Sequence, residues 1–370
     1  MIPAPPPPPP APPAIEQPAA HQVSYGLVTG LAAAGTRRLV VSSGGRELAD
    51  LPLRQRRFTV RVELPPGDTT VRVTTVNAVG RRSSREVGNV FGLPQAASPR
   101  LRASRADAAL ARDVRRLVAA YPGTAGVYVQ SLTSGAGAAW NARARFPAAS
   151  TLKVAVAVAA LASHEGVPLR GSAVDVLLRK MLTYSDNAAA NALEIWLAGS
   201  TSAGAHRVNA LLQSIGIRET IMYGGYIVRS PAGSIPLRVE TQPAWGRGKH
   251  TTALDLASLA RAVWLASSGV GPLPAKQPGF TSADARYLLY LLAHVRDSGK
   301  LGRELGHIPG VRVLHKGGWI DTARHDFGLV FWRGGAYVAS ILTWNGRGAG
   351  IGADVLAGHV ARVALERFRG

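Results

Sequence analysis

A serine and a lysine three residues apart, Ser150 and Lys153, have the types and spacing needed for nucleophilic chemistry. They follow Phe146-Pro147, where a helix is predicted to begin, and this spacing places both side chains on one helix face. The two can then share a proton, and burial or neighbouring cations would lower the lysine pKa enough for it to act as a base. The helix N-terminus would favour an oxyanion beside the serine N–H. The pair predicts acyl transfer through a serine nucleophile.

Two further groups of polar residues follow in the chain. Ser185-Asp186-Asn187 stands at the start of a predicted helix of small residues, and Lys316-Gly317-Gly318-Trp319 lies next to a predicted strand hairpin. Each of the three groups has an ordinary structural explanation by itself: a helix N-cap with a solvated lysine, a second helix cap, and a glycine-rich turn. The occurrence of all three in this order makes them a candidate site.

In this order, the three groups resemble the S-x-x-K, S-D-N and K-T-G motifs of serine penicillin-binding proteins and class A β-lactamases. The resemblance covers residues 105–370 and includes the stretches 251–257 and 325–328. It implies an α+β fold in which an antiparallel β-sheet is flanked by helices and an all-helical subdomain lies beside it. The active site would lie in the cleft between them.

The resemblance also implies catalytic roles. Ser150 would attack a carbonyl carbon and Lys153 would take its proton. Ser185 would relay a proton to the leaving nitrogen, and Lys316 would stabilise the site electrostatically.

Substrate binding is implied at Asn187, Gly318 and Trp319. Asn187 would orient both the substrate and Lys153, and the backbone N–H groups of Ser150 and Trp319 would form the oxyanion hole. The family chemistry needs no cofactor and no metal, and the nine histidines show no ligand spacing.

Two departures from the family pattern affect the predicted activity. Gly317 stands where the third motif usually has a hydroxyl residue, and Arg324 or Thr322 could replace the lost contact with a substrate carboxylate. The window 218–250 lacks the E-x-x-L-N pattern that supplies the deacylating glutamate of class A enzymes. Its acids, Glu219 and Glu240, are more typical of solvated loop carboxylates. Efficient β-lactam turnover is therefore not predicted.

The elements that must position these residues divide the chain into four parts. A proline-rich segment over residues 1–21 is predicted to be disordered, and residues 22–95 alternate like the strands of a small all-β sandwich. The sandwich weakly resembles bacterial immunoglobulin-like modules. A linker over 96–104 leads into the hydrolase domain, 105–370. The main elements predicted there are strands at 126–130 and 138–141, a buried helix at 151–164, helices within 173–265, a hairpin of 327–332 with 337–343, and a helix at 353–368.

Composition narrows the possible partners. The 370 residues carry a net charge of +21, which would attract anionic polymers, including those of a cell wall, but no basic run indicates nucleic-acid binding. The most apolar run, 154–162, is about half the length that a bilayer-spanning helix needs. Cysteine is absent, and the first residues lack the basic and apolar regions of a signal peptide. We expect a monomer that is secreted or associated with a bacterial cell wall.

The function predicted from the sequence is therefore an acyl-serine hydrolase of the class A type, which opens β-lactam rings or cleaves D-Ala-D-Ala-like peptides. Two alternatives stay open. One is a non-catalytic or penicillin-binding relative that binds a wall polymer, and the other is a cytosolic amide or ester hydrolase with an unrelated small substrate.

Overall fold

The computed structural model describes residues 8–228 and 248–370 of the chain. The chain divides into two compact units, Met1–Ser98 and Pro99–Gly370. Each unit is described by itself.

The first unit consists of two β-sheets that share one hydrophobic core. One has the order β1-β3-β6 and the other the order β2-β8-β7-β4-β5. Their bounds are β1 Ala14–Gln17, β2 Gln22–Ser24, β3 Leu27–Leu31, β4 Thr36–Ser43, β5 Arg46–Pro52, β6 Arg57–Arg61, β7 Gly67–Asn77 and β8 Arg82–Gly92. Alternate residues fill the core, including Phe58 and Val60 from one sheet and Val71 and Val73 from the other. The immunoglobulin-like assignment of this sandwich stays a prediction.

The predicted disordered segment 1–21 is too long. Ala14–Gln17 forms β1, which pairs with β3 in an antiparallel ladder, and Ile15 packs against the core. The short stretch after the prolines thus forms the edge strand of a sheet, where pairing satisfies its backbone groups.

A six-stranded sheet forms the centre of the second unit, in the order β14-β15-β16-β10-β11-β9. The strands are β9 Arg105–Ala106, β10 Thr124–Ser131, β11 Ala136–Trp140, β14 Arg312–Ile320, β15 Ala323–Trp332 and β16 Gly335–Trp344. The prediction of a purely antiparallel sheet is wrong at one edge, because β9 pairs with β11 in parallel. Two residues suffice for this pairing, since the backbone N–H groups of Arg105 and Asp107 donate to carbonyls on either side of Ala136.

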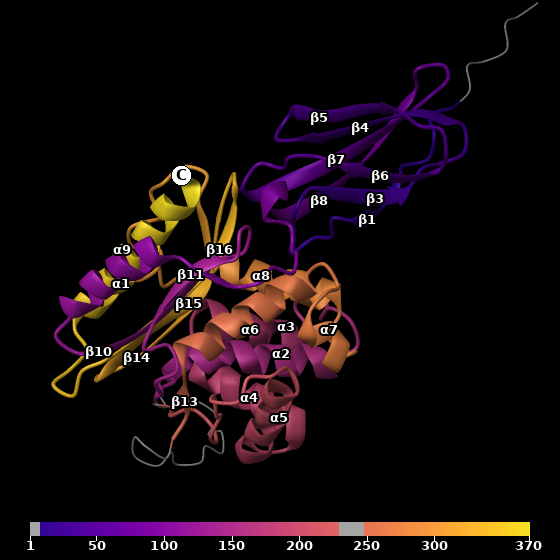
Figure 1. Cartoon of the computed structure of the whole chain (residues 1–370). Helices are drawn as coiled ribbons and strands as arrows, with labels where there is room; N and C mark the ends of the chain where they lie inside the picture. Colours follow the sequence, from indigo (N-terminus) through magenta and orange to yellow (C-terminus); the bar gives the residue numbers. More distant parts are fainter. Residues whose placement is uncertain (1–7, 229–247) are drawn as a thin grey trace, which may run out of the picture. The chain divides into compact units, whose positions relative to one another are not determined.

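Helices α1 (Ala108–Ala119) and α9 (Ile351–Arg369) pack against each other and cover one face of this sheet (Figure 1). Asp107 caps α1 by accepting from two backbone N–H groups, so the helix begins directly after β9. Leu110, Val114 and Val118 recur at helical spacing and are buried with residues of β10 and α9. The first and last helices of this unit therefore cover one face of its sheet.

The opposite face is covered by helices from the middle of the chain (Figure 1). Helix α6 contacts β10, β15 and β16, while α8 contacts β14. The helices of this part are α2 Lys153–Ser163, α3 Ala173–Thr183, α4 Asn187–Ala198, α5 Thr201–Ser214, α6 Ala253–Ala266, α7 Pro272–Lys276 and α8 Ser282–Ala293. Helix α2 is buried over nine consecutive residues from Lys153 to Leu161, as expected of a helix that is apolar on every side.

The segment before the predicted nucleophile is fixed by a short two-stranded ladder. Strand β12 (Phe146–Pro147) pairs with β13 (His250–Thr251), which precedes α6. Within the described residues, no helix is long and apolar enough to cross a membrane. The same residues contain no cluster of three or more His, Cys, Asp or Glu side chains placed to hold a metal ion.

Candidate active site

Ser150 and Lys153 meet at a junction between two kinds of helix. Ser150 lies in a 3₁₀-helix, Ala149–Leu152, and the α-helix predicted from residue 151 begins only at Lys153. Because residues three apart eclipse in a 3₁₀-helix, this turn brings the side chains together more directly than an α-helix would. The Lys153 ammonium nitrogen lies 3.1 Å from Ser150 Oγ.

Lys153 is completely buried and makes several contacts in the site. Its Nζ donates to Asn187 Oδ1 at 2.6 Å and to the main-chain carbonyl of Ser185. Burial, followed by the positive charge of Lys316, lowers its pKa to about 6. Lys153 is therefore largely uncharged at neutral pH and can accept the proton of Ser150.

Ser185 stands between two lysines. Its Oγ lies 3.2 Å from Lys153 Nζ and accepts a hydrogen bond from Lys316 Nζ at 3.0 Å. The residue has a left-handed backbone conformation, with φ of +59°, just before Asp186 caps α4. Burial lowers the pKa of Lys316 to about 8, although Asp326 acts in the opposite direction. The Ser185 hydroxyl thus bridges two amines that differ in their affinity for a proton.

Strand β14 lies directly against the serine segment at Gly318. A Cβ on Gly318 would lie 2.8 Å from the backbone nitrogen of Ser150, so only glycine allows this approach. The next residue, Trp319, is 61% exposed at the end of the strand. The packing places the β14 backbone beside the N–H of Ser150, as an oxyanion hole requires.

A cavity of about 220 Å³ opens in front of Ser150. It contains three of the predicted residues together with others that sequence reasoning missed. Its lining is Pro147, Ala149, Ser150, Asn187, Tyr226, Ile227, Gly248, Lys249, Trp319 and Ile320. Together with the buried Lys153, Ser185, Lys316 and Gly318, the structure brings all seven predicted site residues to one place.

Tyr226 is the first of the missed residues. Its ring centroid lies 4.8 Å from Lys153 Nζ, and its backbone is held at both ends by Asn191, which donates to its carbonyl and accepts from its N–H. The adjacent Ile227 carbonyl accepts a hydrogen bond from Asn187 Nδ2. The segment around Tyr226 is thus tied to the same helix that orients Lys153.

A polar stripe on α4 is the sequence signal that could have revealed this arrangement. Asn187, Asn191 and Glu194 are spaced i, i+4 and i+7 in a helix that is otherwise rich in alanine and leucine. Asn191 and Glu194 are fully buried. Buried polar groups on one helix face require partners, and the first two find them in the segment 226–227.

Neither candidate deacylating acid is seen beside Lys153. Glu219 binds Arg145 at 2.6 Å, and this contact lowers the pKa of its exposed carboxyl group. Glu240 lies outside the described residues. Among the residues that the structure describes, no carboxylate is hydrogen-bonded to Lys153, and the aromatic ring of Tyr226 lies 4.8 Å from its Nζ.

Gly317 packs against an ion pair. A Cβ there would lie 2.8 Å from Asp297 Oδ2 and 3.2 Å from Lys300 Nζ, and these two side chains bind each other. A hydroxyl side chain at this position would therefore require the ends of these two side chains to shift.

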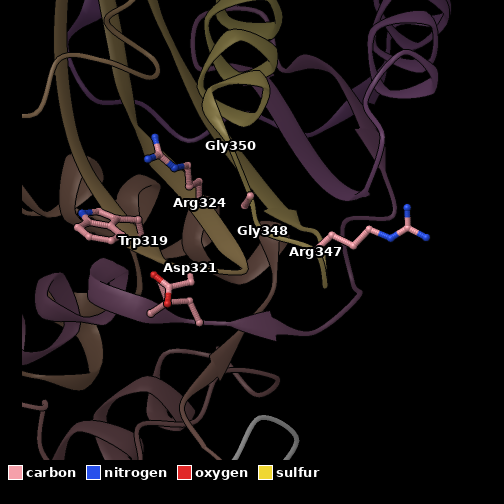
Figure 2. Close-up of a pocket in the computed structure, with 8 residues that line it drawn as sticks. Trp319, Asp321, Arg324, Arg347, Gly348 and Gly350 are labelled. Atoms are coloured by element: carbon pink, nitrogen blue, oxygen red, sulfur yellow. The ribbon is translucent and has the colours of Figure 1, made fainter.

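A second cavity, of about 380 Å³, adjoins the first beyond Trp319 (Figure 2). Trp319 and Ile320 line both cavities, and Asp321, Arg324 and Arg347 complete the polar lining of the second. Arg324 is ion-paired with Asp354 of α9, whereas the side chain of Arg347 extends away from the other labelled residues. Thr322, the other residue considered for binding a carboxylate, lines neither cavity.

His325 has a structural position behind the site. Its Nδ1 accepts from the N–H of Thr343, and its Nε2 therefore donates to the Pro147 carbonyl at 2.6 Å. Burial lowers its pKa to about 4, so the ring stays neutral. It ties β15 to the segment that precedes Ser150.

Comparison with known proteins identifies the fold. The structure of PBP-A is 22% identical, with a TM-score of 0.56, and the match covers 73% of this chain and 99% of that one. A variant of the last common ancestor of Gram-negative class A β-lactamases is 21% identical, with a TM-score of 0.54 over 71% of this chain and 99% of that one. The β-lactamase from Sphaerobacter thermophilus DSM 20745 is also 21% identical, with a TM-score of 0.51, and the match covers 70% of this chain and 96% of that one.

These neighbours show the α+β fold of the penicillin-recognising serine enzymes. The model of the beta-lactamase enzyme family matches residues 109–170 and 168–368, and the chain therefore belongs to that family. A search of curated proteins finds no match.

Proposed function

We propose that this protein forms a covalent acyl-enzyme at Ser150 with β-lactams or with D-Ala-D-Ala-like wall peptides. One observation carries the proposal: a buried lysine whose pKa is lowered to about 6 lies 3.1 Å from the serine hydroxyl and touches a second serine on its other side. Among the described residues, no carboxylate is within ion-pair distance of this lysine, and a buried amine with a lowered pKa beside a hydroxyl has the surroundings of a base.

The geometry supports an acyl transfer in which each bond change and each proton has a residue to carry it. Lys153 accepts the Ser150 hydroxyl proton while Oγ attacks the carbonyl carbon, and the backbone N–H groups beside Gly318 hold the resulting oxyanion. When the intermediate collapses, the C–N bond breaks and the proton passes from Lys153 through the Ser185 hydroxyl to the leaving nitrogen. The product is an ester on Ser150. Lys316, held against Ser185, supplies positive charge during both transfers.

Slow hydrolysis of this ester is the second part of the proposal. Deacylation needs a base that activates a water molecule, and the group beside Lys153 is the Tyr226 ring, whose hydroxyl is kept protonated by burial. One structural neighbour, a mutant of PBP-A, is an acyl-enzyme complex with penicillin G. We therefore expect a penicillin-binding enzyme with little β-lactam turnover.

The second cavity supports a role in substrate binding. Arg324 on β15 lines this cavity and forms an ion pair with Asp354. A carboxylate on the substrate would find a guanidinium group there in place of the hydroxyl missing at Gly317.

The proposal is tested by intact-protein mass spectrometry after incubation with a penicillin and a chromogenic cephalosporin, while absorbance reports turnover. We expect a stable adduct on the native protein and none on Ser150→Ala. Rapid turnover would refute slow deacylation. The absence of any adduct would refute the acyl-enzyme and favour a relative that only binds wall polymer.

A further inference from the structure

A third buried lysine lies at the site and has no role in the steps described above. Lys249 is 5% exposed and lines the cavity in front of Ser150. Its Nζ donates to the Tyr223 carbonyl at 2.9 Å and to the Gly225 carbonyl. Burying an ammonium group costs free energy unless the group is well paired, so the hydrogen bonds of Lys249 must offset that cost.

The two contacts of Lys249 hold the segment that orients the catalytic lysine. Beyond Gly225, the Ile227 carbonyl accepts from Asn187, whose other side-chain atom binds Lys153. The backbone carbonyl of Lys249 also accepts a hydrogen bond from the N–H of Ala148, two residues before the nucleophile. Lys249 is thus connected to both halves of the Ser150–Lys153 pair.

The Tyr226 ring lies close to the side-chain nitrogens of both lysines. Its ring centroid is 4.4 Å from Lys249 Nζ and 4.8 Å from Lys153 Nζ. A ring this close attracts a cation, and the charge of Lys249 also lowers the pKa of Lys153. The buried carboxyl group of Glu194 on α4 acts on both lysines and opposes the lowering of their pKa values by burial.

We propose that Lys249 is a positioning residue for acylation: it fixes the 223–227 segment and, through its charge, keeps Lys153 in the form that accepts the Ser150 proton. This inference rests on the proposed acyl-enzyme chemistry.

The charged groups around Lys153 set the sign of the electrostatic effect. Lys316 from β14 and Lys249 lower the Lys153 pKa, whereas Asp186 and Glu194 from α4 raise it. Removing the Lys249 charge therefore raises the Lys153 pKa. Since the uncharged amine is the base, the pH at which acylation becomes fast must then move upward.

Three variants separate positioning from charge. Lys249→Met removes both, Lys249→Gln removes the charge but keeps donors for the two carbonyls, and Lys249→Arg keeps both. The exposed Lys276→Met on α7 is the matched control. The measurement is the rate constant for adduct formation with a penicillin between pH 5 and 8.

We expect Lys249→Met to acylate roughly tenfold or more slowly at pH 7, from lost hydrogen bonds to a charged group. The acid side of its pH–rate profile should move to higher pH, and the same shift is expected for Lys249→Gln. Lys249→Arg and Lys276→Met should keep the acid side of the native profile. If Lys249→Met does not fold, Lys249→Gln still tests the charge.

The proposal is overturned if the two neutral variants keep the native pH limb, whatever their rates. If the native protein forms no adduct, the proposed function itself fails, which is a distinguishable result.

Discussion

At the scale of single residues, Gly317 packs against two side chains outside its motif, those of Asp297 and Lys300. Because a Cβ there would meet Asp297 Oδ2 at 2.8 Å, restoring the family hydroxyl with Gly317→Thr should not improve the site. We expect the variant to lose about 1–3 kcal/mol of stability through overpacking and to acylate more slowly.

A double-mutant cycle checks this expectation. Urea unfolding of Gly317→Ala, Asp297→Ala and the double variant should show that the glycine substitution costs less once the aspartate is removed. Equal costs in both backgrounds would contradict the proposed steric origin.

The pKa of Lys153, about 6, predicts the pH dependence of acylation. The rate constant should rise as pH increases through 6, because the amine loses its proton and becomes a base. It should fall again above about pH 8, where Lys316 loses the charge that supports the transfer. Stopped-flow acylation between about pH 5 and pH 9.5 measures both limbs, and a flat profile on the acid side of neutrality would be incompatible with this role of Lys153.

At the scale of elements, helix α4 holds the Tyr226 segment, and a neighbouring helix offers a matched control. Asn191 on α4 clamps the backbone of Tyr226, and Asn209 on α5 clamps the backbone of Met222 in the same way. Either change to alanine leaves two backbone groups without their side-chain partner, at a cost of about 1–3 kcal/mol.

Asn191→Ala should slow acylation more than Asn209→Ala, because the segment that Asn191 holds contacts Asn187 and Lys153 directly, whereas Met222 reaches them only through Tyr226. Thermal unfolding and adduct formation measured on both variants separate the two effects. Equal loss of acylation in both would show that loop stability in general, and not this clamp, controls the site.

Several elements of the second unit were predictable because their signals are local. The apolar run 154–162 marks α2, and two apolar runs, 327–332 and 337–343, separated by Arg333-Gly334-Gly335, mark the hairpin of β15 and β16. The position of Tyr226 was not predictable in the same way, because it depends on side chains of α4 that are distant in sequence. The parallel pairing of β9 was missed for a related reason: two residues carry no periodicity.

At the scale of the whole molecule, the predicted site residues all belong to one of the two units. All seven predicted site residues lie between residues 150 and 319, in the unit Pro99–Gly370. The composition predicted two folded parts, and the change from alternating to helical periodicity located their junction near residue 100. The sequence contained no sign of β1, because a four-residue strand between prolines is indistinguishable from an extended linker.

The buried lysine beside Ser150 also has a thermodynamic consequence for folding. Lys153 has a pKa of about 6 in the folded chain but an ordinary value near 10.5 when unfolded, so unfolding takes up a proton at every pH between these values. The resulting destabilisation is complete below about pH 6, diminishes as pH rises, and vanishes above about 10.5. Near neutrality it amounts to several kcal/mol.

Lys153→Met should therefore abolish acylation and yet gain stability relative to the native protein as pH is lowered from about 9 toward 6. Chemical unfolding of both proteins across that range measures the difference, and a difference independent of pH would show that the lysine is charged in the folded state. If the expectation holds, Lys153 lowers the free energy of unfolding most at the pH where the folded protein protonates this lysine. The reactive form of the site has then been selected at the expense of thermodynamic stability.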